Sequence, residues 1–226
     1  RGPVTLRNAL AQSLNIPSVK TLYLAGIKNS IQTAGDMGIT TLVGEDRYGL
    51  TLVLGGGEVE LIEMTSAYGV FAAHGVRHPS TPILRIEDSK GEVIEEYTNL
   101  SIQALPEEVS RHITDVLSDN NARAPAFGDN SYLNFPGHDV ADKTGTTNDY
   151  RDAWIIGYTP NITVGAWAGN NDNTPMEKKV AGFIVAPMWN AFMKEAIASL
   201  PEEKFEKPEL TDSKNLKPAL KGVWQG

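Results

Sequence analysis

The chain has 226 residues, of which 41% are hydrophobic and 21% charged, enough apolar material for one packed domain or slightly more. It carries 28 acidic against 20 basic side chains, a net charge of −8, and so lacks the basic excess expected of a nucleic-acid partner. The absence of cysteine excludes disulfides, a cysteine nucleophile and thiolate metal sites, and no apolar run is long enough to span a bilayer.

The first part of the chain predicts mainly helices. Thr5 can cap a short helix, and residues 13–16 should form a turn. A second helix then starts with Pro17 in its first turn and carries three side chains inward, Val19, Leu22 and Tyr23. Glycines 55–57 break the chain, and the apolar residues that follow from Leu61 at helical spacing predict a helix that ends at His74-Gly75.

The middle of the chain predicts a hairpin, a helix and a sheet. Residues 82–86 and 92–97 flank a turn and predict a small β-hairpin, and Pro106 begins the next helix. Three strand-like segments are separated by short turns, which favours antiparallel neighbours. These segments are 139–147, 153–158 and 162–168.

The last predicted helix runs from about residue 185 to 200. Its large apolar side chains are expected on one side; they are Met188, Trp189, Phe192, Met193 and Ile197. Beyond it, residues 201–226 are rich in proline and charge and predict a polar tail or linker, while residues 1–200 form the domain. Helices followed by an antiparallel meander predict an α+β fold, with an antiparallel sheet flanked by helices.

Lys143-Thr144-Gly145-Thr146 lies on the first of the three predicted sheet strands. A glycine there allows the backbone of a ligand to approach the strand as an added strand would. The lysine supplies positive charge, and the threonine hydroxyls can bind a carboxylate. The alternative interpretation is a strand that ends in a glycine bulge, with its lysine in solvent.

Ser13-Leu14-Asn15 places a serine and an asparagine in the turn after the first helix. The pattern is weak on its own, because serine and asparagine are common in helix C-terminal turns. Ser118-Asp119-Asn120 repeats it without any surrounding motif.

Four segments in order resemble the class A penicillin-binding proteins. Residues 1–22 resemble the family around its S-x-N motif, and residues 54–73 resemble its Gly-rich turn and following helix. Residues 113–128 resemble its arginine-bearing segment, and residues 143–160 its K-T-G-T-T strand and the strand after it. The resemblance implies the serine beta-lactamase/penicillin-binding transpeptidase-like fold, incomplete at its N-terminal side.

The resemblance also implies an activity and a location. The expected activity is that of a peptidoglycan D,D-transpeptidase, which cross-links stem peptides ending in D-Ala-D-Ala through a serine acyl-enzyme and binds beta-lactams. It implies neither a metal nor another cofactor. The expected location is the extracytoplasmic face of a bacterial cell membrane, with the anchor upstream of Arg1.

Three residues match catalytic groups of the family. Ser13 matches the serine that relays protons towards the leaving group. In the family this serine lies next to two lysines, that of the S-x-x-K motif and that of the K-T-G motif. Asn15 matches the asparagine that hydrogen-bonds the substrate amide or the nucleophile's lysine, and Lys143 matches the lysine that tunes this network. Ser118 precedes Lys143 by only 25 residues, so the family order assigns the serine role to Ser13.

The remaining motif residues match substrate-binding groups. Thr144 and Thr146 match the side chains that hold the terminal carboxylate of the stem peptide, and Gly145 lies between them on the binding strand. The backbone N–H of Thr146 is expected to form half of the oxyanion hole.

The nucleophile of the family is absent from the sequence. None of the 12 serines is followed by a lysine three residues later, so no S-x-x-K motif is present. We expect an upstream N-terminal segment to carry it, and this chain alone to be inactive. Two alternatives stay open: a non-catalytic peptidoglycan-binding or scaffold module that lost the serine, and a D,D-carboxypeptidase or beta-lactamase.

Overall fold

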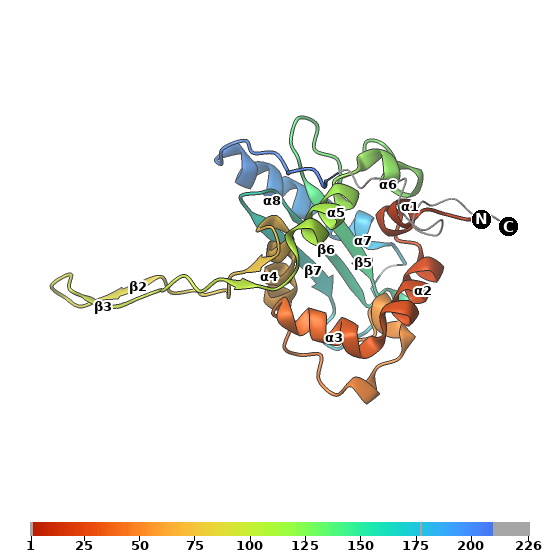
Figure 1. The fold of residues 1–226 in the computed structure, drawn as a ribbon. Helices are drawn as coiled ribbons and strands as arrows, with labels where there is room; N and C mark the ends of the chain where they lie inside the picture. Colours follow the sequence, from red (N-terminus) through yellow and green to blue (C-terminus); the bar gives the residue numbers. More distant parts are fainter. Residues whose placement is uncertain (1, 177, 210–226) are drawn as a thin grey trace.

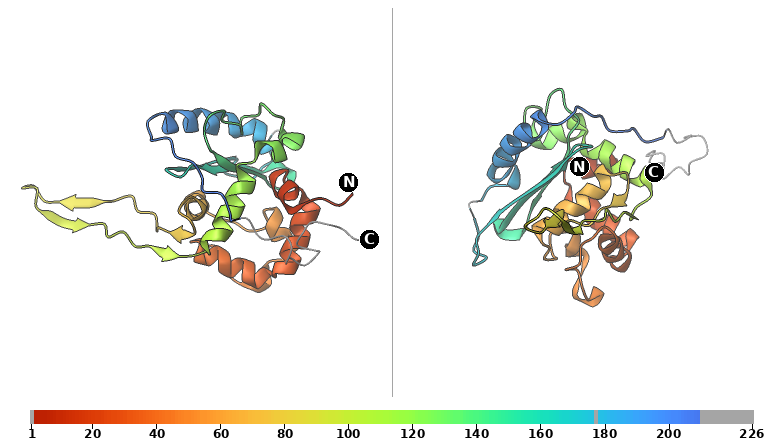
Figure 2. Two further views of the ribbon diagram at one scale, coloured as in Figure 1. Left: turned by 45° about the horizontal axis from the view of Figure 1, so that its top comes forward. Right: turned by 90° about the vertical axis from the view of Figure 1, so that its left-hand side faces the viewer.

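A computed structural model describes residues 2–176 and 178–209. Helices cover both faces of a three-stranded sheet, and a two-stranded arm extends far from this body (Figure 1). Two further views place α8 on one face of the sheet and α4 with α5 on the other (Figure 2). The helices are α1 (Leu6–Ala11), α2 (Asn15–Ala25), α3 (Ile27–Asp36), α4 (Leu61–Ala72), α5 (Glu107–Leu117), α6 (Asn120–Phe127), α7 (Ala181–Ile184) and α8 (Ala186–Ala198).

The main sheet has the strand order β5-β6-β7, and both pairs are antiparallel. This arrangement confirms the three predicted neighbouring strands and the α+β class. Among the described residues, the sheet leaves one side of β5 unpaired. The strands are β1 (Val76–Arg77), β2 (Arg85–Glu87), β3 (Val93–Glu96), β4 (Ile102–Gln103), β5 (Ala141–Thr146), β6 (Asp152–Tyr158) and β7 (Thr163–Gly169).

The pleat of β5 divides its motif between the two faces of the sheet. Lys143 pairs with Ile156 and Thr144 with Ile155, so consecutive residues point to opposite sides. Lys143 therefore shares the face of Tyr158, which packs against α4 and α5. Thr144 shares the face of Ile155, which packs against α7 and α8.

Helix α8 covers the second face through only part of its predicted apolar side. Trp189, Met193 and Ile197 are buried, and the Trp189 indole donates a hydrogen bond to the Val164 carbonyl at 2.9 Å. Met188 and Phe192 are 59% and 60% exposed, so the prediction that all five side chains share one buried side is wrong. Each residue turns 100° around a helix axis, which carries positions 188 and 192 away from the sheet.

Helix α2 differs from its prediction at both its start and its buried face. It begins at Asn15, two residues before Pro17, which occupies the first turn of the helix. Leu22 is buried as expected, whereas Tyr23 is 72% exposed. Consecutive residues of a short helix on a molecular surface rarely face the same neighbour, and here only Leu22 reaches the core.

The predicted hairpin is confirmed as β2 and β3, which pair with an irregularity between Ile86 and Glu87. All seven strand residues are exposed, and the hairpin projects away from the helices and the main sheet in Figure 1 and in the left-hand view of Figure 2. We call this projection the hairpin arm.

Residues 201–209 form a strap along α5, where the sequence predicts a solvated tail. Phe205 packs edge-on against buried Tyr158, with ring centroids 5.6 Å apart, and its backbone N–H donates to the Asp139 carboxylate at 3.2 Å. Lys207 pairs with Asp115 at 3.0 Å. One aromatic anchor and paired charges thus order a segment of polar composition. Residues 210–226 of the expected tail lie outside the described residues, and its boundary at residue 200 stays a prediction.

Candidate active site

The turn after α1 presents Ser13 in a strained backbone conformation. Its φ is +57°, in the left-handed region that usually takes glycine. The Ser13 N–H donates to the Leu10 carbonyl at 3.1 Å, and the Leu14 N–H donates to the Ala9 carbonyl at 2.9 Å. These two bonds form a Schellman cap, which fixes the direction in which the Ser13 side chain leaves the helix.

The two motifs meet in space although they lie 130 residues apart. The Lys143 ammonium donates to the Ser13 hydroxyl oxygen at 2.7 Å and to the Thr144 carbonyl at 2.8 Å. Ser13 comes from the end of a helix and Lys143 from the middle of a strand, so the contact depends on how α1 packs against the sheet.

The environment of Lys143 favours its neutral form more than water does. Burial lowers the pKa of Lys143 to about 8, while the nearby Asp142 carboxylate acts against this shift and Arg123 adds to it. At neutral pH the ammonium form still predominates, but its proton is easier to remove than that of a solvated lysine. A lysine in this state, bonded to a hydroxyl, can help to move a proton along a short relay.

The packing of this chain leaves room for a side chain at position 145, so it does not explain why glycine occurs there. Its backbone does not have a positive φ, and an added Cβ would meet the Trp154 Cβ at 3.4 Å, close to ordinary contact. Because the side of β5 away from β6 is unpaired among the described residues, the backbone around Gly145 is accessible to an added extended chain.

The threonines have different surroundings. The Thr146 hydroxyl oxygen accepts a hydrogen bond from the Ala181 N–H at 3.0 Å, which ties β5 to the start of α7. Its hydroxyl proton stays available, because a hydroxyl group can donate and accept at once. The Thr144 side chain makes no hydrogen bond to the described part of the chain.

Asn15 is brought into the same turn as Ser13 but not into the hydrogen-bonded contact. It is the first residue of α2, is exposed, and its side chain has no hydrogen-bond partner within residues 2–176 and 178–209. The sequence placed Gly55 in the Gly-rich turn but did not indicate its neighbour: an added Cβ at this glycine would lie 3.0 Å from the Thr147 methyl group. The Gly-rich turn thus closes against the end of β5, which a run of three glycines alone did not indicate.

The profile of the penicillin binding protein transpeptidase domain matches residues 1–194 of the chain. The chain belongs to this family. The matched range includes both Ser13 and Lys143, so their contact lies within the domain that defines the family.

Curated relatives support the same membership. Penicillin-binding protein 1A of Aquifex aeolicus is 34% identical over 222 residues, which cover 96% of this chain and 29% of that protein. Penicillin-binding protein 2D of Bacillus subtilis is 31% identical over 212 residues, which cover 92% of this chain and 30% of that protein. The chain thus spans a little under a third of the length of these relatives.

Solved structures share the fold. The penicillin-binding protein PonA1 of Mycobacterium tuberculosis superposes with a TM-score of 0.80 at 25% identity, over 91% of this chain and 60% of that one. A structure of the same protein in complex with penicillin V gives a TM-score of 0.79 at 24% identity, with the same coverage.

The second S-x-N triplet has a structural role in this chain. Ser118 is the C-cap of α5, and the Asp119 carboxylate caps α6 by accepting from the Ala122 N–H at 2.9 Å. The Asn120 amide donates to the Asp129 carbonyl at 3.1 Å. These contacts account for the triplet without any part in the Lys143 network.

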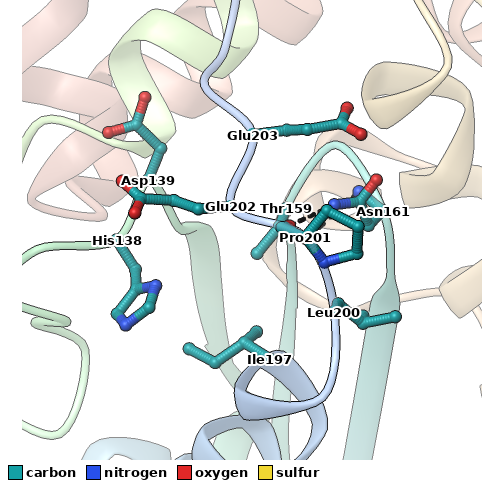
Figure 3. A pocket seen from close by; sticks show the side chains of 9 residues that line it. All are labelled: His138, Asp139, Thr159, Asn161, Ile197, Leu200, Pro201, Glu202 and Glu203. Carbon is teal, nitrogen blue, oxygen red and sulfur yellow. Dashed lines mark hydrogen bonds between the residues drawn. The ribbon is translucent and has the colours of Figure 1, made fainter.

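One small pocket lies at the far end of β5 and β6 (Figure 3). It is lined in part by His138, Asp139 and Thr159, and Asn161 donates across it to the Pro201 carbonyl at 2.8 Å. Register places Thr146 at the opposite end of the same strand, so this pocket is separate from the Ser13–Lys143 contact. It is the space enclosed by the strap rather than a substrate groove.

One exposed group among the described residues has the composition of a cation site. His74, Glu107 and Glu206 bring ligand atoms within 4.8 Å of one another. Arg111 already pairs with both glutamates, so a cationic side chain occupies the position that a metal would take. No helix among the described residues is long and apolar enough to cross a membrane.

Proposed function

We propose that this chain supplies the S-x-N and K-T-G part of a peptidoglycan D,D-transpeptidase site. The single observation that carries the proposal is the 2.7 Å contact between Ser13 and Lys143, in a chain of this family. The serine of an S-x-x-K motif attacks the carbonyl of the penultimate D-alanine, an acyl-enzyme forms, and the terminal D-alanine leaves. An amine of a neighbouring stem peptide then takes the acyl group and releases the serine.

The proposed proton path runs through Ser13. Its hydroxyl passes a proton towards the departing D-alanine amine. Lys143 holds that hydroxyl in place and stabilises the negative charge that develops on its oxygen as the proton leaves. Asn15 binds the substrate amide or the nucleophile's lysine. The lowered pKa of Lys143 supports this assignment, because a proton relay works best when its members have pKa values near the working pH.

The proposed substrate groove runs along the unpaired side of β5. Thr144 and Thr146 hold the terminal carboxylate through their hydroxyls, and the Thr146 N–H polarises the reacting carbonyl. Gly145 leaves room for the backbone of the stem peptide, and beta-lactams occupy the same groove. The penicillin V complex of PonA1, which shares this fold, is consistent with that assignment.

We further propose that an upstream segment carries the nucleophile and the membrane anchor, which places the domain on the extracytoplasmic face of the cell membrane. The absence of an S-x-x-K motif supports the first part, since the rest of the site cannot form an acyl-enzyme without it. The much greater length of the relatives leaves room for such a segment.

Intact mass spectrometry with benzylpenicillin tests the proposal. We expect no adduct on the 226-residue chain, and one adduct on the full-length product of the gene. Ser13→Ala and Lys143→Ala in the full-length protein are expected to slow adduct formation by about a hundredfold or more, as removal of an active-site proton-transfer group does.

Ser118→Ala is the matched control, because it removes the serine of the other S-x-N triplet and should leave acylation unchanged. An adduct on the 226-residue chain itself would contradict the assignment of the nucleophile. A full-length protein that forms no adduct would favour the non-catalytic module instead.

A further inference from the structure

A buried ion pair lies on the strand of Lys143, one residue before the lysine and on the opposite face of the sheet. Arg123 of α6 and Asp142 of β5 have side chains only 4% and 1% exposed, and the guanidinium approaches one carboxylate oxygen. Burying two charges costs free energy that their attraction often fails to recover. The pair therefore needs an explanation beyond stability, and Asp142 is the residue immediately before Lys143.

The two partners belong to the two halves of the candidate site. Arg123 also donates to the Leu117 carbonyl at 2.7 Å, at the end of α5. Its helix, α6, is tied to α1 by the Gln12 amide, which donates to the Ala122 carbonyl at 3.1 Å. Helix α1 carries the Ser13 turn, while Asp142 sits on the strand of Lys143. The ion pair is thus a buried link between the element that presents the serine and the element that presents the lysine.

We propose that Arg123 and Asp142 are positioning residues for the Ser13–Lys143 pair. Their ion pair holds α6, and with it α1, at a fixed distance from β5, so that the lysine ammonium reaches the serine hydroxyl. That the Ser13–Lys143 contact serves catalysis rests on the proposed function. That the ion pair holds this contact in place does not, because the contact forms within this chain without substrate.

The charge of Asp142 reaches Lys143 as well. Neither oxygen of Asp142 accepts an aligned hydrogen bond from the described residues, so its charge is balanced by nearby cations. Burial raises the pKa of Asp142 to about 6 although Arg123 and Lys143 oppose this, which leaves the carboxyl mostly ionised at neutral pH. The charge of Asp142 also acts through space on two tyrosines of the opposite face of the sheet, Tyr68 and Tyr158, whose pKa values it raises further.

An NMR titration of this chain tests the proposal without any ligand. Lysine labelled at Cε reports the pKa of Lys143, and Lys143→Arg identifies its signal. Asp142→Asn removes the negative charge and leaves Arg123 in place, so the pKa of Lys143 should fall by about one unit. Asp142→Glu should restore it. Arg111→Met, which removes a cation that pairs only with glutamates on the surface, is the control and should change nothing.

A second variant guards against misfolding. Arg123→Met combined with Asp142→Leu replaces the ion pair by apolar side chains, an exchange that commonly preserves or raises stability. We expect this double variant to fold and to lose the nuclear Overhauser contact between Ser13 Hβ and Lys143 Hε, which Arg111→Met should retain. A double variant that keeps this contact together with an unchanged Lys143 pKa would overturn the proposal. Benzylpenicillin acylation plays no part here, so this outcome is separate from a failure of the proposed function.

Discussion

Ser13 combines a strained backbone with a polar contact that its side chain alone can make. A non-glycine residue at positive φ costs on the order of 1 kcal/mol, and the C′ position of a Schellman cap usually takes glycine to avoid this cost. Here a serine occupies the position, and its hydroxyl accepts from Lys143. The backbone conformation and the side-chain contact therefore favour different residues at the same position.

Ser13→Gly is expected to raise the free energy of unfolding relative to Ser13→Ala by about 0.5–1 kcal/mol, because glycine relieves the strain and alanine does not. Both variants lose the hydroxyl, so their difference isolates the backbone. Urea denaturation of the 226-residue chain measures it.

The same two substitutions at Ser118 provide the control. Its φ is −93°, where glycine has no advantage, so Ser118→Gly should be no more stable than Ser118→Ala. Equal stabilities for the glycine and alanine variants at position 13 would contradict the strain at that turn.

At the scale of elements, the 201–209 strap shows how few residues are needed to order a polar segment. Phe205 packs on Tyr158, whose hydroxyl is itself within hydrogen-bond distance of Thr114 at 2.9 Å in the core. Lys207 joins Asp115, which also pairs with Arg7 of α1. The strap thereby fastens α5 to the sheet and shares an ionic contact with the helix that ends at Ser13.

Phe205→Ala should lower the free energy of unfolding by about 2 kcal/mol, less than for a fully buried phenylalanine because this ring is only half-buried. Lys204→Ala, at an exposed position beside it, should change stability by less than about 0.5 kcal/mol. Thermal and urea unfolding of both variants measure the difference. Equal stabilities would mean that the strap does not pack as described.

The sequence was a good guide to elements whose contacts are local. Alternating apolar residues and short turns predicted β5, β6 and β7 and their antiparallel pairing, because neighbouring strands joined by short turns can pair in few ways. The resemblance to class A penicillin-binding proteins brought Ser13 and Lys143 forward as candidates, and the structure places them in contact.

Features that depend on distant partners were not predictable in this way. The strap is polar on average, and this average hides the single residue Phe205, which packs on Tyr158, a buried residue distant in the sequence. Asp142 looks like an ordinary charge in a strand, and only the fold brings Arg123 to it. The left-handed conformation of Ser13 is equally hidden, since the position usually carries glycine.

At the scale of the whole molecule, the hairpin arm is nearly independent of the body. Its two strands bury none of their side chains, and an isolated two-stranded hairpin is at best marginally stable in water. The folded core that holds Ser13 and Lys143 therefore draws little from it.

Replacement of residues 85–96 by a short Gly-Ser linker should change the free energy of unfolding by less than about 1 kcal/mol, because no core contact is removed. The pKa of Lys143 should also stay near 8. Urea denaturation and the lysine titration check both expectations. A loss of more than about 2 kcal/mol would mean that the arm contributes to the core after all.

The strain at Ser13 has an evolutionary consequence. In a lineage that still uses the hydroxyl, selection must keep a residue that the backbone disfavours, and each change to glycine is removed although it relieves the strain of the turn. In a lineage that no longer needs the hydroxyl, that change is no longer removed, so loss of the hydroxyl and relief of the backbone strain arrive in a single substitution. Position 13 would then record when a descendant of this protein stopped using the hydroxyl.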